Sequence, residues 1–230
     1  MKNVDFMLNK LSGQEKFSVP YEKVLVIGYS GRNMEKTMEH IKELEEQLNV
    51  PAPKKIPTIF ECSLETLTQE KNIKFVGDQT SGEIEYIIIY MNGKTYIGIG
   101  SDHTDRKLES VSVPKSKQVC AKPIGNELWD YDDIKEHWDQ IKMVSCQIID
   151  GKEVKYQDGK LADILKVEKI LEELKERVGN IDNSIIYSGT VPLLDGFKYG
   201  DTFKCMMIDE VLKRTLKLEY GIDRISEEER

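Results

Sequence analysis

Three acidic residues are spaced so that a β-hairpin would gather their side chains. Glu83 and Glu85 stand one residue apart at the start of an apolar run, 84–91 (IEYIIIYM), and Asp102 follows a second apolar run, 94–100 (KTYIGIG). Alternate residues of a strand point to the same face of a sheet, so the two glutamates share a face. Carboxylate oxygens that meet at one point are the ligands that Mg²⁺ and Mn²⁺ prefer.

The register of the hairpin decides which acids meet. The two runs are joined by Asn-Gly, the strongest short hairpin signal, because both turn positions need a positive φ. A two-residue turn sets Glu85 opposite Gly100 and Glu83 opposite Asp102. Directly opposed Cβ atoms lie roughly 4.5–5.5 Å apart, so three carboxylates would crowd one patch, with Gly100 leaving room above it. Because opposed like charges are destabilising, we expect a bound cation, Mg²⁺ or Mn²⁺, to offset them.

A second interpretation of the three acids is an exposed hairpin face that only keeps the edge of a sheet soluble. The flanking run 84–91 is almost wholly apolar, which is typical of a strand buried on both faces. Acids at the mouth of a buried strand favour a functional site. On the residues alone, both interpretations stay open.

The composition limits the class of protein. The 230 residues suit one large domain, and 39% hydrophobic residues are enough for a sizeable core. The net charge of −8 comes without a basic cluster, which argues against nucleic-acid binding. No apolar leader and no long apolar stretch stand out, so we expect no membrane span and a cytoplasmic protein. The four cysteines are dispersed without a Cys-x-x-Cys pair, so a structural zinc site is not expected.

Short strands and a few helices must position the acids. Besides the first hairpin, Asp-Gly at 150–151 predicts a second one. Segment 103–128 has little periodicity and is expected to be a long functional loop. Helices are expected at 33–48, 132–140 and 161–177, and further strands at 23–27, 58–61, 143–149, 152–157, 184–188, 202–208 and 214–220. This order predicts an α+β, β-rich fold.

The segments that carry these residues, in this order, resemble the fumarylacetoacetate hydrolase superfamily in its short bacterial single-domain form, within an uncharacterised branch. The resemblance implies a mixed-sheet roll of the fumarylacetoacetate hydrolase C-terminal domain type over residues 23–222, after an N-terminal extension, 1–22, and before a charged tail, 223–230. The matching segments are Glu83-Ile84-Glu85, Asp102 to Arg106, His40-Ile41-Lys42-Glu43, Ser116-Lys117-Gln118, Asp150-Gly151-Lys152 through Gln157, Ser188-Gly189-Thr190 and Gly200-Asp201.

The resemblance implies metal ligands and catalytic groups. It selects Glu83, Glu85 and Asp102 as the ligands, the same carboxylates as the hairpin geometry. The implied catalytic residues are His40, Glu43 and Lys117. His40 and Glu43 lie three residues apart on one helix, where a carboxylate beside an imidazole would make a base that activates water. Lys117 would bind the substrate carboxylate or an oxyanion. Without the resemblance, these three are typical solvated side chains.

Further residues are candidates for substrate binding. The resemblance implies that Gly189 and Thr190 bind a substrate carboxylate, against the alternative of a plain turn. Arg32, in the Gly-rich turn Gly28-Tyr29-Ser30-Gly31-Arg32, is another candidate for an anion contact. The same turn has no third glycine at the spacing of a dinucleotide fingerprint, so nucleotide-cofactor binding is not expected.

The expected function is a divalent-metal-dependent hydrolase that cleaves a C–C bond in a small 2-oxo or β-dicarbonyl acid. The ion would chelate the carboxylate and keto oxygens and stabilise an enolate. Decarboxylation, isomerisation and dehydration can pass through the same enolate, so they stay open as alternatives, as does a catalytically silent ligand-binding scaffold. The family resemblance also implies a homodimer.

Overall fold

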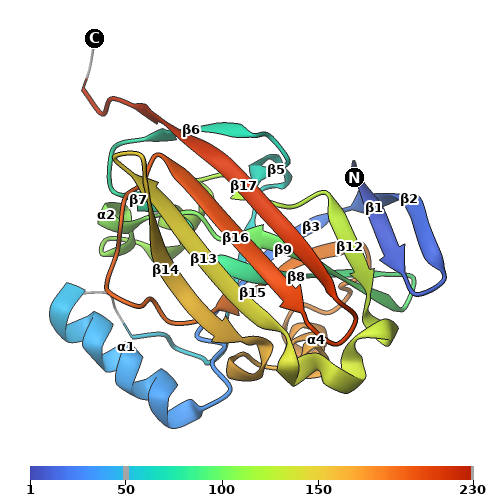
Figure 1. Cartoon of the computed structure of the whole chain (residues 1–230). Coiled ribbons are helices and arrows are strands. Elements are labelled where there is room, and N and C mark those ends of the chain that lie inside the picture. The colour runs from blue at the N-terminus through green and yellow to red at the C-terminus, as the bar shows by residue number, and fades with distance from the viewer. Residues whose placement is uncertain (49–51, 229–230) are drawn as a thin grey trace.

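Two β-sheets packed face to face make up most of the molecule. The structure, a computed structural model, describes residues 1–48 and 52–228, and it leaves out the side chains at positions 40, 43, 44, 47 and 48. The larger sheet has eight strands in the order β2-β1-β12-β9-β8-β15-β3-β4, and the smaller has five in the order β14-β13-β16-β17-β6. Figure 1 shows the five-stranded sheet in front and α1 at the edge of the molecule, at the lower left of this view.

The elements have the following bounds. The helices are α1 Met34–Leu48, α2 Arg106–Glu109, α3 Val113–Gln118 and α4 Val167–Arg177, with 3-10 helices at Leu64–Thr66, Tyr131–Asp133, Lys135–Gln140 and Leu161–Asp163. The strands are β1 Lys2–Lys10, β2 Gly13–Tyr21, β3 Lys23–Gly28, β4 Thr58–Cys62, β5 Leu67–Thr68, β6 Asn72–Val76, β7 Thr80–Ser81, β8 Ile84–Met91, β9 Lys94–Ser101, β10 Thr104–Asp105, β11 Lys122–Pro123, β12 Glu127–Asp130, β13 Lys142–Ile149, β14 Lys152–Lys160, β15 Ser184–Thr190, β16 Thr202–Asp209 and β17 Arg214–Ile225.

The central hairpin, β8–β9, has the predicted register. Asn92 and Gly93 have φ values of 51° and 73°, as a two-residue turn with positive φ at both positions requires. Glu85 pairs with Gly100 across the two strands. Beyond the last pair of the ladder, the backbone N–H of Asp102 donates to the carbonyl of residue 83 over 3.0 Å. The prediction of which residues lie opposite each other is therefore confirmed.

Strand β8 lies in the middle of the larger sheet and is buried on both faces. Its even-numbered side chains, such as Tyr86 and Ile88, join the core between the two sheets. The odd-numbered Ile87 and Ile89 join a second core on the opposite face, and Glu85 begins that same row. Because both cores need apolar residues, the sequence of β8 is nearly all apolar, as expected for a strand covered on both faces.

The expectation of a long loop over 103–128 is wrong. This segment contains α2, α3, β10, β11 and the first two residues of β12. Its helices are only four and six residues long, so they show no apolar period. Local features start them instead: the Asp105 carboxylate accepts from the N–H of Leu108, and Pro114 stands in the first turn of α3. Within the segment, Ile124 bridges Gly100, and β12 at its end pairs with β9, so the segment lies against β9.

The two ends of the chain extend the sheets. The 1–22 extension forms the hairpin β1–β2, and β1 pairs in parallel with β12, so the hairpin lengthens the larger sheet. Phe6 and Leu8 from this hairpin are buried in the second core. At the other end, β17 pairs with β6 as far as Ile225, so the first residues of the predicted tail are part of a strand.

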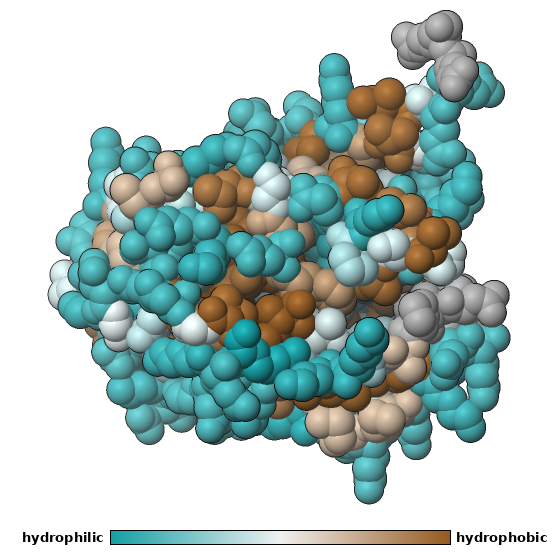
Figure 2. Space-filling view, turned by 180° about the vertical axis from the view of Figure 1, so that it is seen from behind, coloured by the Kyte–Doolittle hydropathy of each residue, from teal (hydrophilic) through white to brown (hydrophobic). Residues whose placement is uncertain are grey.

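The outer surface is mostly polar. Figure 2 shows hydrophilic side chains over most of the face opposite to that of Figure 1, interrupted by several separate apolar patches. Within residues 1–48 and 52–228, no helix combines the length and the apolar character that crossing a membrane requires.

Candidate metal and substrate site

The Glu85 carboxylate is buried at the beginning of β8. Only 2% of the residue is exposed, and its Oε2 accepts a hydrogen bond from the backbone N–H of Gly189 over 2.8 Å. Burial, and next the negative charge of Asp102, raise the pKa of Glu85 well above its usual range. A buried carboxylate with an acidic neighbour needs a nearby cation to stay ionised.

Two lysines pair with Asp102, which is 1% exposed. The Lys117 ammonium donates to Oδ2, and the Lys122 ammonium lies 3.3 Å from Oδ1. Burial alone would raise the pKa of Asp102, but the charges of Lys117 and Lys122 outweigh it and lower the pKa to about 2. Asp102 is therefore an ionised group clamped between two ammonium groups.

Glu83 turns toward Arg106 at the start of α2. Its Oε2 lies 3.3 Å from Arg106 Nη2, and the guanidinium also donates to the hydroxyl and the carbonyl of Ser81 over 2.8 and 3.2 Å. The Phe197 ring lies under the same guanidinium, with 4.4 Å between the ring centroid and Cζ. Arg106 thus offsets the charge of the third carboxylate.

Lys117 reaches Asp102 from the last turn of α3. The side chain is nearly buried, and its Nζ lies 5.7 Å from the centroid of the Phe60 ring. Burial alone would lower the pKa of Lys117, but the charge of Asp102 outweighs it, so the pKa is raised and the group stays protonated. The residue that the resemblance selected as the active-site lysine therefore lies at one of the predicted metal ligands.

Gly189 and Thr190 end strand β15 beside Glu85. Gly189 has a φ of 92°, a conformation that side chains other than glycine rarely adopt. The Thr190 hydroxyl donates to the Ile84 carbonyl over 2.6 Å and accepts from Gln157 Nε2 over 2.8 Å. Both residues lie next to the proposed ligands, but the Thr190 hydroxyl is already used to hold β15 against β8.

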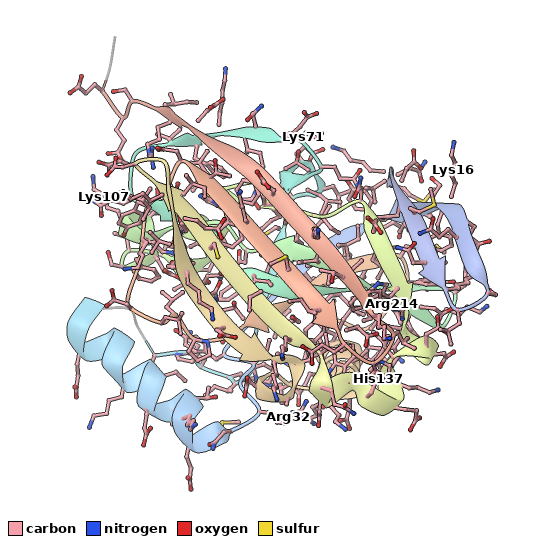
Figure 3. The ribbon with its side chains drawn as sticks, viewed as in Figure 1. Lys16, Arg32, Lys71, Lys107, His137 and Arg214 are labelled. Carbon is pink, nitrogen blue, oxygen red and sulfur yellow. The ribbon has the colours of Figure 1, made fainter. Side chains whose placement is uncertain are left out.

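Arg32 contacts none of the three carboxylates. Its guanidinium binds both carboxylate oxygens of Asp139 at 2.9 Å, and it also donates to the carbonyls of Leu161 and Ile164 over 3.1 Å. In Figure 3, Arg32 is well separated from Lys107, which belongs to α2 next to Arg106. These contacts join the turn after β3 to the segment before α4, and they do not bring Arg32 to the three carboxylates.

The predicted water-activating pair, His40 and Glu43, lies on α1. The backbone of this helix spans the predicted 33–48 segment almost fully, and Asn33 Oδ1 accepts from the N–H of Lys36 at its first turn, as an N-cap does. The side chains of His40 and Glu43 lie outside the described part of the structure. Their catalytic role stays a prediction.

Buried polar residues that the sequence pattern did not select surround Asp102. Lys122 is fully buried, and His103 stacks on Phe75 with 3.7 Å between the ring centroids. His103 Nδ1 lies 2.9 Å from the hydroxyl of Tyr220, and its Nε2 has no hydrogen-bond partner among the described residues. Burial, and next the charge of Lys122, lower the pKa of His103 well below its usual range, so the imidazole is neutral. A lone lysine next to a proline carries no local signal of burial.

Gln157 fixes the relative position of the two sheets beside the site. Its Oε1 accepts from the N–H of Ile84 over 3.0 Å and from the Ser145 hydroxyl over 2.9 Å. Its Nε2 donates to Thr190 Oγ1 and to the Val191 carbonyl over 2.8 and 2.7 Å. A bulge opposite Ser145 and Cys146 shifts the register of β14, so that the consecutive Tyr156 and Gln157 are both buried.

The donor set fits a hard divalent cation. Glu83, Glu85 and Asp102 offer carboxylate oxygens only, and the buried Glu85 accepts a single hydrogen bond from the described residues. In the described part of the chain, no three acidic, histidine or cysteine side chains surround one point in a geometry that could hold an ion. Arg106 and Lys117 pair with two of the three carboxylates, Glu83 and Asp102. Metal binding would therefore require these cations to give up part of their contacts.

A comparison with protein families identifies one match. The model of the family described as "Protein of unknown function (DUF2848)" matches residues 27–220, which is most of the chain. A search of curated proteins gave no match.

Solved structures share the fold at low sequence identity. The apo form of 2-keto-3-deoxy-D-arabinonate dehydratase superposes with a TM-score of 0.66 at 18% identity, covering 93% of this chain and 77% of that one. The same enzyme has been solved with magnesium and 2,5-dioxopentanoate. Fumarylacetoacetate hydrolase from the psychrophilic Exiguobacterium antarcticum gives 0.59 at 16% identity, covering 94% and 83% of the two chains. The 4-oxalocrotonate decarboxylase of Pseudomonas putida G7, solved with calcium and acetate, gives 0.54 at 12% identity, covering 90% and 78%.

These likenesses confirm the predicted fold class, an α+β, β-rich roll of the fumarylacetoacetate hydrolase C-terminal domain type. The enzymes that share it catalyse different reactions, so the fold does not select one. The chain belongs to the family described as "Protein of unknown function (DUF2848)", and it has the fold of fumarylacetoacetate hydrolase.

Proposed function

We propose that this protein is a divalent-metal-dependent enzyme that acts on a small 2-oxo acid through an enolate. The observation that supports this most is the pair of buried carboxylates, Glu85 and Asp102, held beside each other at the mouth of a buried strand. One structural neighbour, 2-keto-3-deoxy-D-arabinonate dehydratase, has a 2-keto acid in its name and was solved with magnesium and 2,5-dioxopentanoate. Another, 4-oxalocrotonate decarboxylase, was solved with calcium.

Glu83, Glu85 and Asp102 are the residues that would hold the ion, Mg²⁺ or Mn²⁺. When bound, such an ion supplies Lewis-acid stabilisation for negative charge that develops on the substrate oxygens. The burial of Glu85 and Asp102 makes this site a region of low dielectric, where charged groups act on each other more strongly than in water.

Lys117 is the proposed residue for binding the substrate. Its ammonium is protonated and sits against Asp102, so it can donate to a substrate carboxylate or to an enolate oxygen next to the metal ligands. Gly189 and Thr190 end β15 beside Glu85. We propose that they also bind the substrate carboxylate. We leave Arg32 out of the proposed site, because its guanidinium is engaged by Asp139 and two carbonyls.

Hydrolysis of a C–C bond is the reaction that we propose first. His40, oriented by Glu43, would take a proton from water, and the hydroxide would add to the carbonyl carbon at the far side of the bond that breaks. When this bond breaks, its electron pair becomes the enolate, which a proton then quenches. The fragments are a carboxylic acid and a shorter 2-oxo acid.

Dehydration or decarboxylation is the second candidate. It is favoured by the dehydratase and the decarboxylase among the structural neighbours. Both reactions lead to the same kind of enolate without the attack of water on a carbonyl. Replacing His40 separates the two candidates: His40→Ala should abolish hydrolysis, whereas full hydrolytic turnover by this variant would remove His40 from the mechanism.

Metal titration tests the site itself. We expect the wild-type chain to bind Mn²⁺, as detected by electron paramagnetic resonance, and Glu85→Gln and Asp102→Asn to lose most of this affinity, because each removes a charged ligand without changing the side-chain volume. Glu136→Gln, at an exposed acid outside the site, is the matched control. Unchanged affinity in Asp102→Asn would refute the ligand assignment.

A panel of 2-oxo acids with added Mn²⁺ tests the reaction. Turnover of one panel member, lost in Asp102→Asn, supports an enzyme, and the products distinguish hydrolysis from loss of water or of CO₂. Metal binding without turnover of any member would favour the ligand-binding scaffold. A cytoplasmic homodimer remains part of the proposal, and light scattering of the purified protein measures its oligomeric state.

A further inference from the structure

Lys122 holds its ammonium group inside a shell of oxygens. The side chain is fully buried, and Nζ donates to the carbonyls of His103, Lys117 and Cys120 over 2.7, 2.5 and 3.2 Å. The fourth neighbour is Asp102 Oδ1 at 3.3 Å. Three carbonyl oxygens and a carboxylate oxygen around one charge make a shell that a monovalent cation would also find favourable.

The shell joins three segments that carry the proposed site. Asp102 and His103 follow β9, and Lys117 lies in the last turn of α3, so the ammonium ties these two segments to each other. The main chain of Lys122 is also fixed, because its carbonyl accepts from the hydroxyl of Tyr187 over 2.8 Å. Tyr187 stands two residues before Gly189 on β15. The position of each segment therefore depends on contacts with this one lysine.

The two lysines at Asp102 are held in different ways. Within the described part of the chain, Lys117 Nζ has Asp102 as its only hydrogen-bond acceptor, whereas Lys122 Nζ has three main-chain acceptors besides the carboxylate. Lys117 can move to a substrate when Asp102 changes partner. Lys122 stays where it is, because leaving the shell would strand three buried carbonyls.

We propose that Lys122 is a positioning residue, a built-in cation that fixes Asp102 and the Lys117 segment relative to β9 for binding of a divalent ion. The part that concerns the divalent ion rests on the proposed function. Lys122 acts through Asp102 and the main chain and touches no reacting group.

A variant that lacks the Lys122 ammonium, supplied with a small ammonium ion from solution, tests whether the oxygen shell requires a cation. Lys122→Ala removes three methylene groups and the ammonium, a fragment that propylammonium matches. We expect the Tm of Lys122→Ala to fall by roughly 10 °C, because a buried carboxylate and three carbonyls lose their partner. Propylammonium present during refolding should restore most of this loss. Tetramethylammonium, which has no N–H, and 1-propanol, which has no charge, should restore little.

Controls distinguish the effect of the positive charge from the effect of filling the space. Lys115→Ala removes an exposed lysine of α3, the helix before Lys122. Each of the three additives should change the Tm of this variant by as much as it changes the Tm of wild type. If 1-propanol restores Lys122→Ala as well as propylammonium does, Lys122 only fills space and the proposal is wrong. If Lys122→Ala does not fold even with propylammonium, the proposal is also wrong, because the shell then does not accept a free cation.

The direction in which the affinity for Mn²⁺ changes tests the positioning role. Lys122→Met keeps the volume and removes the charge. We expect the folded variant to bind Mn²⁺ about ten- to a hundredfold more weakly than wild type, as is usual when a partner of a metal ligand is lost. Loss of a positive charge alone would strengthen cation binding, and a purely structural role would leave it unchanged, so either result overturns the proposal. If wild type binds no Mn²⁺, the proposed function fails, and the propylammonium experiment alone decides the role of Lys122.

Discussion

At the scale of single residues, Gly189 has two tasks at the candidate site. Its N–H donates to the buried Glu85 carboxylate, and its φ of 92° leads the chain from β15 past the turn after β3. An added Cβ would lie 1.9 Å from Ser30 Oγ and 3.1 Å from the Ile27 carbonyl oxygen. The position therefore needs glycine for its conformation and for the close approach of its neighbours.

We predict that Gly189→Ala lowers the free energy of unfolding by more than about 3 kcal/mol, since the strained φ and the steric clash add up. Urea denaturation measures the change. Gly196→Ala is the matched control, because Gly196 has a φ of 56° but no atom within 4 Å of an added Cβ, so it should lose only about 1–2 kcal/mol. Ser30→Gly in the Gly189→Ala chain should recover part of the loss. Equal losses at the two glycines would contradict the clash.

The sequence predicts the acids of the site better than their counter-charges. Glu85 and Asp102 follow from a local pattern, because a two-residue turn fixes which residues of a hairpin lie opposite each other. The cations Arg106 and Lys122 reach the acids through tertiary contacts that leave no trace in spacing. From the sequence we therefore expected a metal ion to offset the three acids. In the structure, Arg106, Lys117 and Lys122 also offset them.

At the scale of elements, the β8–β9 hairpin separates its turn from its functional end. The turn residues and the carboxylates lie at opposite ends of β8, six residues apart between Glu85 and Met91, which amounts to about 20 Å of strand. A change in the turn should act on folding without reaching the site.

We predict that Gly93→Ala lowers the free energy of unfolding by about 1–2 kcal/mol, because φ at this position is 73° and alanine is strained there. Affinity for Mn²⁺ should stay at the wild-type value. Gly151→Ala, at the equivalent turn of the β13–β14 hairpin with a φ of 72°, should behave in the same way. A change in Mn²⁺ affinity in Gly93→Ala but not in Gly151→Ala would show that β8 transmits strain from its turn to the carboxylates.

Elements with strong local signals could be predicted, and those stabilised by distant partners could not. Both hairpins and α1 carry turn or capping residues, and they occur where expected. The helices α2 and α3 are too short for a period, and the hairpin β1–β2 is stable because β1 pairs with β12, more than a hundred residues away. Such elements depend on the finished fold.

At the scale of the whole molecule, Gln157 connects the two sheets beside the site. It lies on β14 of the smaller sheet, and its side-chain amide bonds to the main chain of Ile84 and Val191 and to Thr190, all next to the larger sheet. All four hydrogen-bonding positions of the amide have a partner, and the residue is fully buried. Each sheet thereby helps to align the other at the residues proposed to bind metal and substrate.

We predict that Gln157→Glu lowers the free energy of unfolding at pH 7 by more than about 3 kcal/mol. The carboxylate has no N–H, so it loses the bonds to Thr190 and Val191, and it sets a negative charge against the carbonyl oxygen of Val191. A protonated acid would again donate one hydrogen bond, so the difference from wild type should shrink as the pH falls toward 5. Urea denaturation of both chains at each pH measures it. Gln140→Glu, at an exposed glutamine, should stay within about 0.5 kcal/mol of wild type, and equal effects at the two positions would mean that the amide does not hold the sheets together.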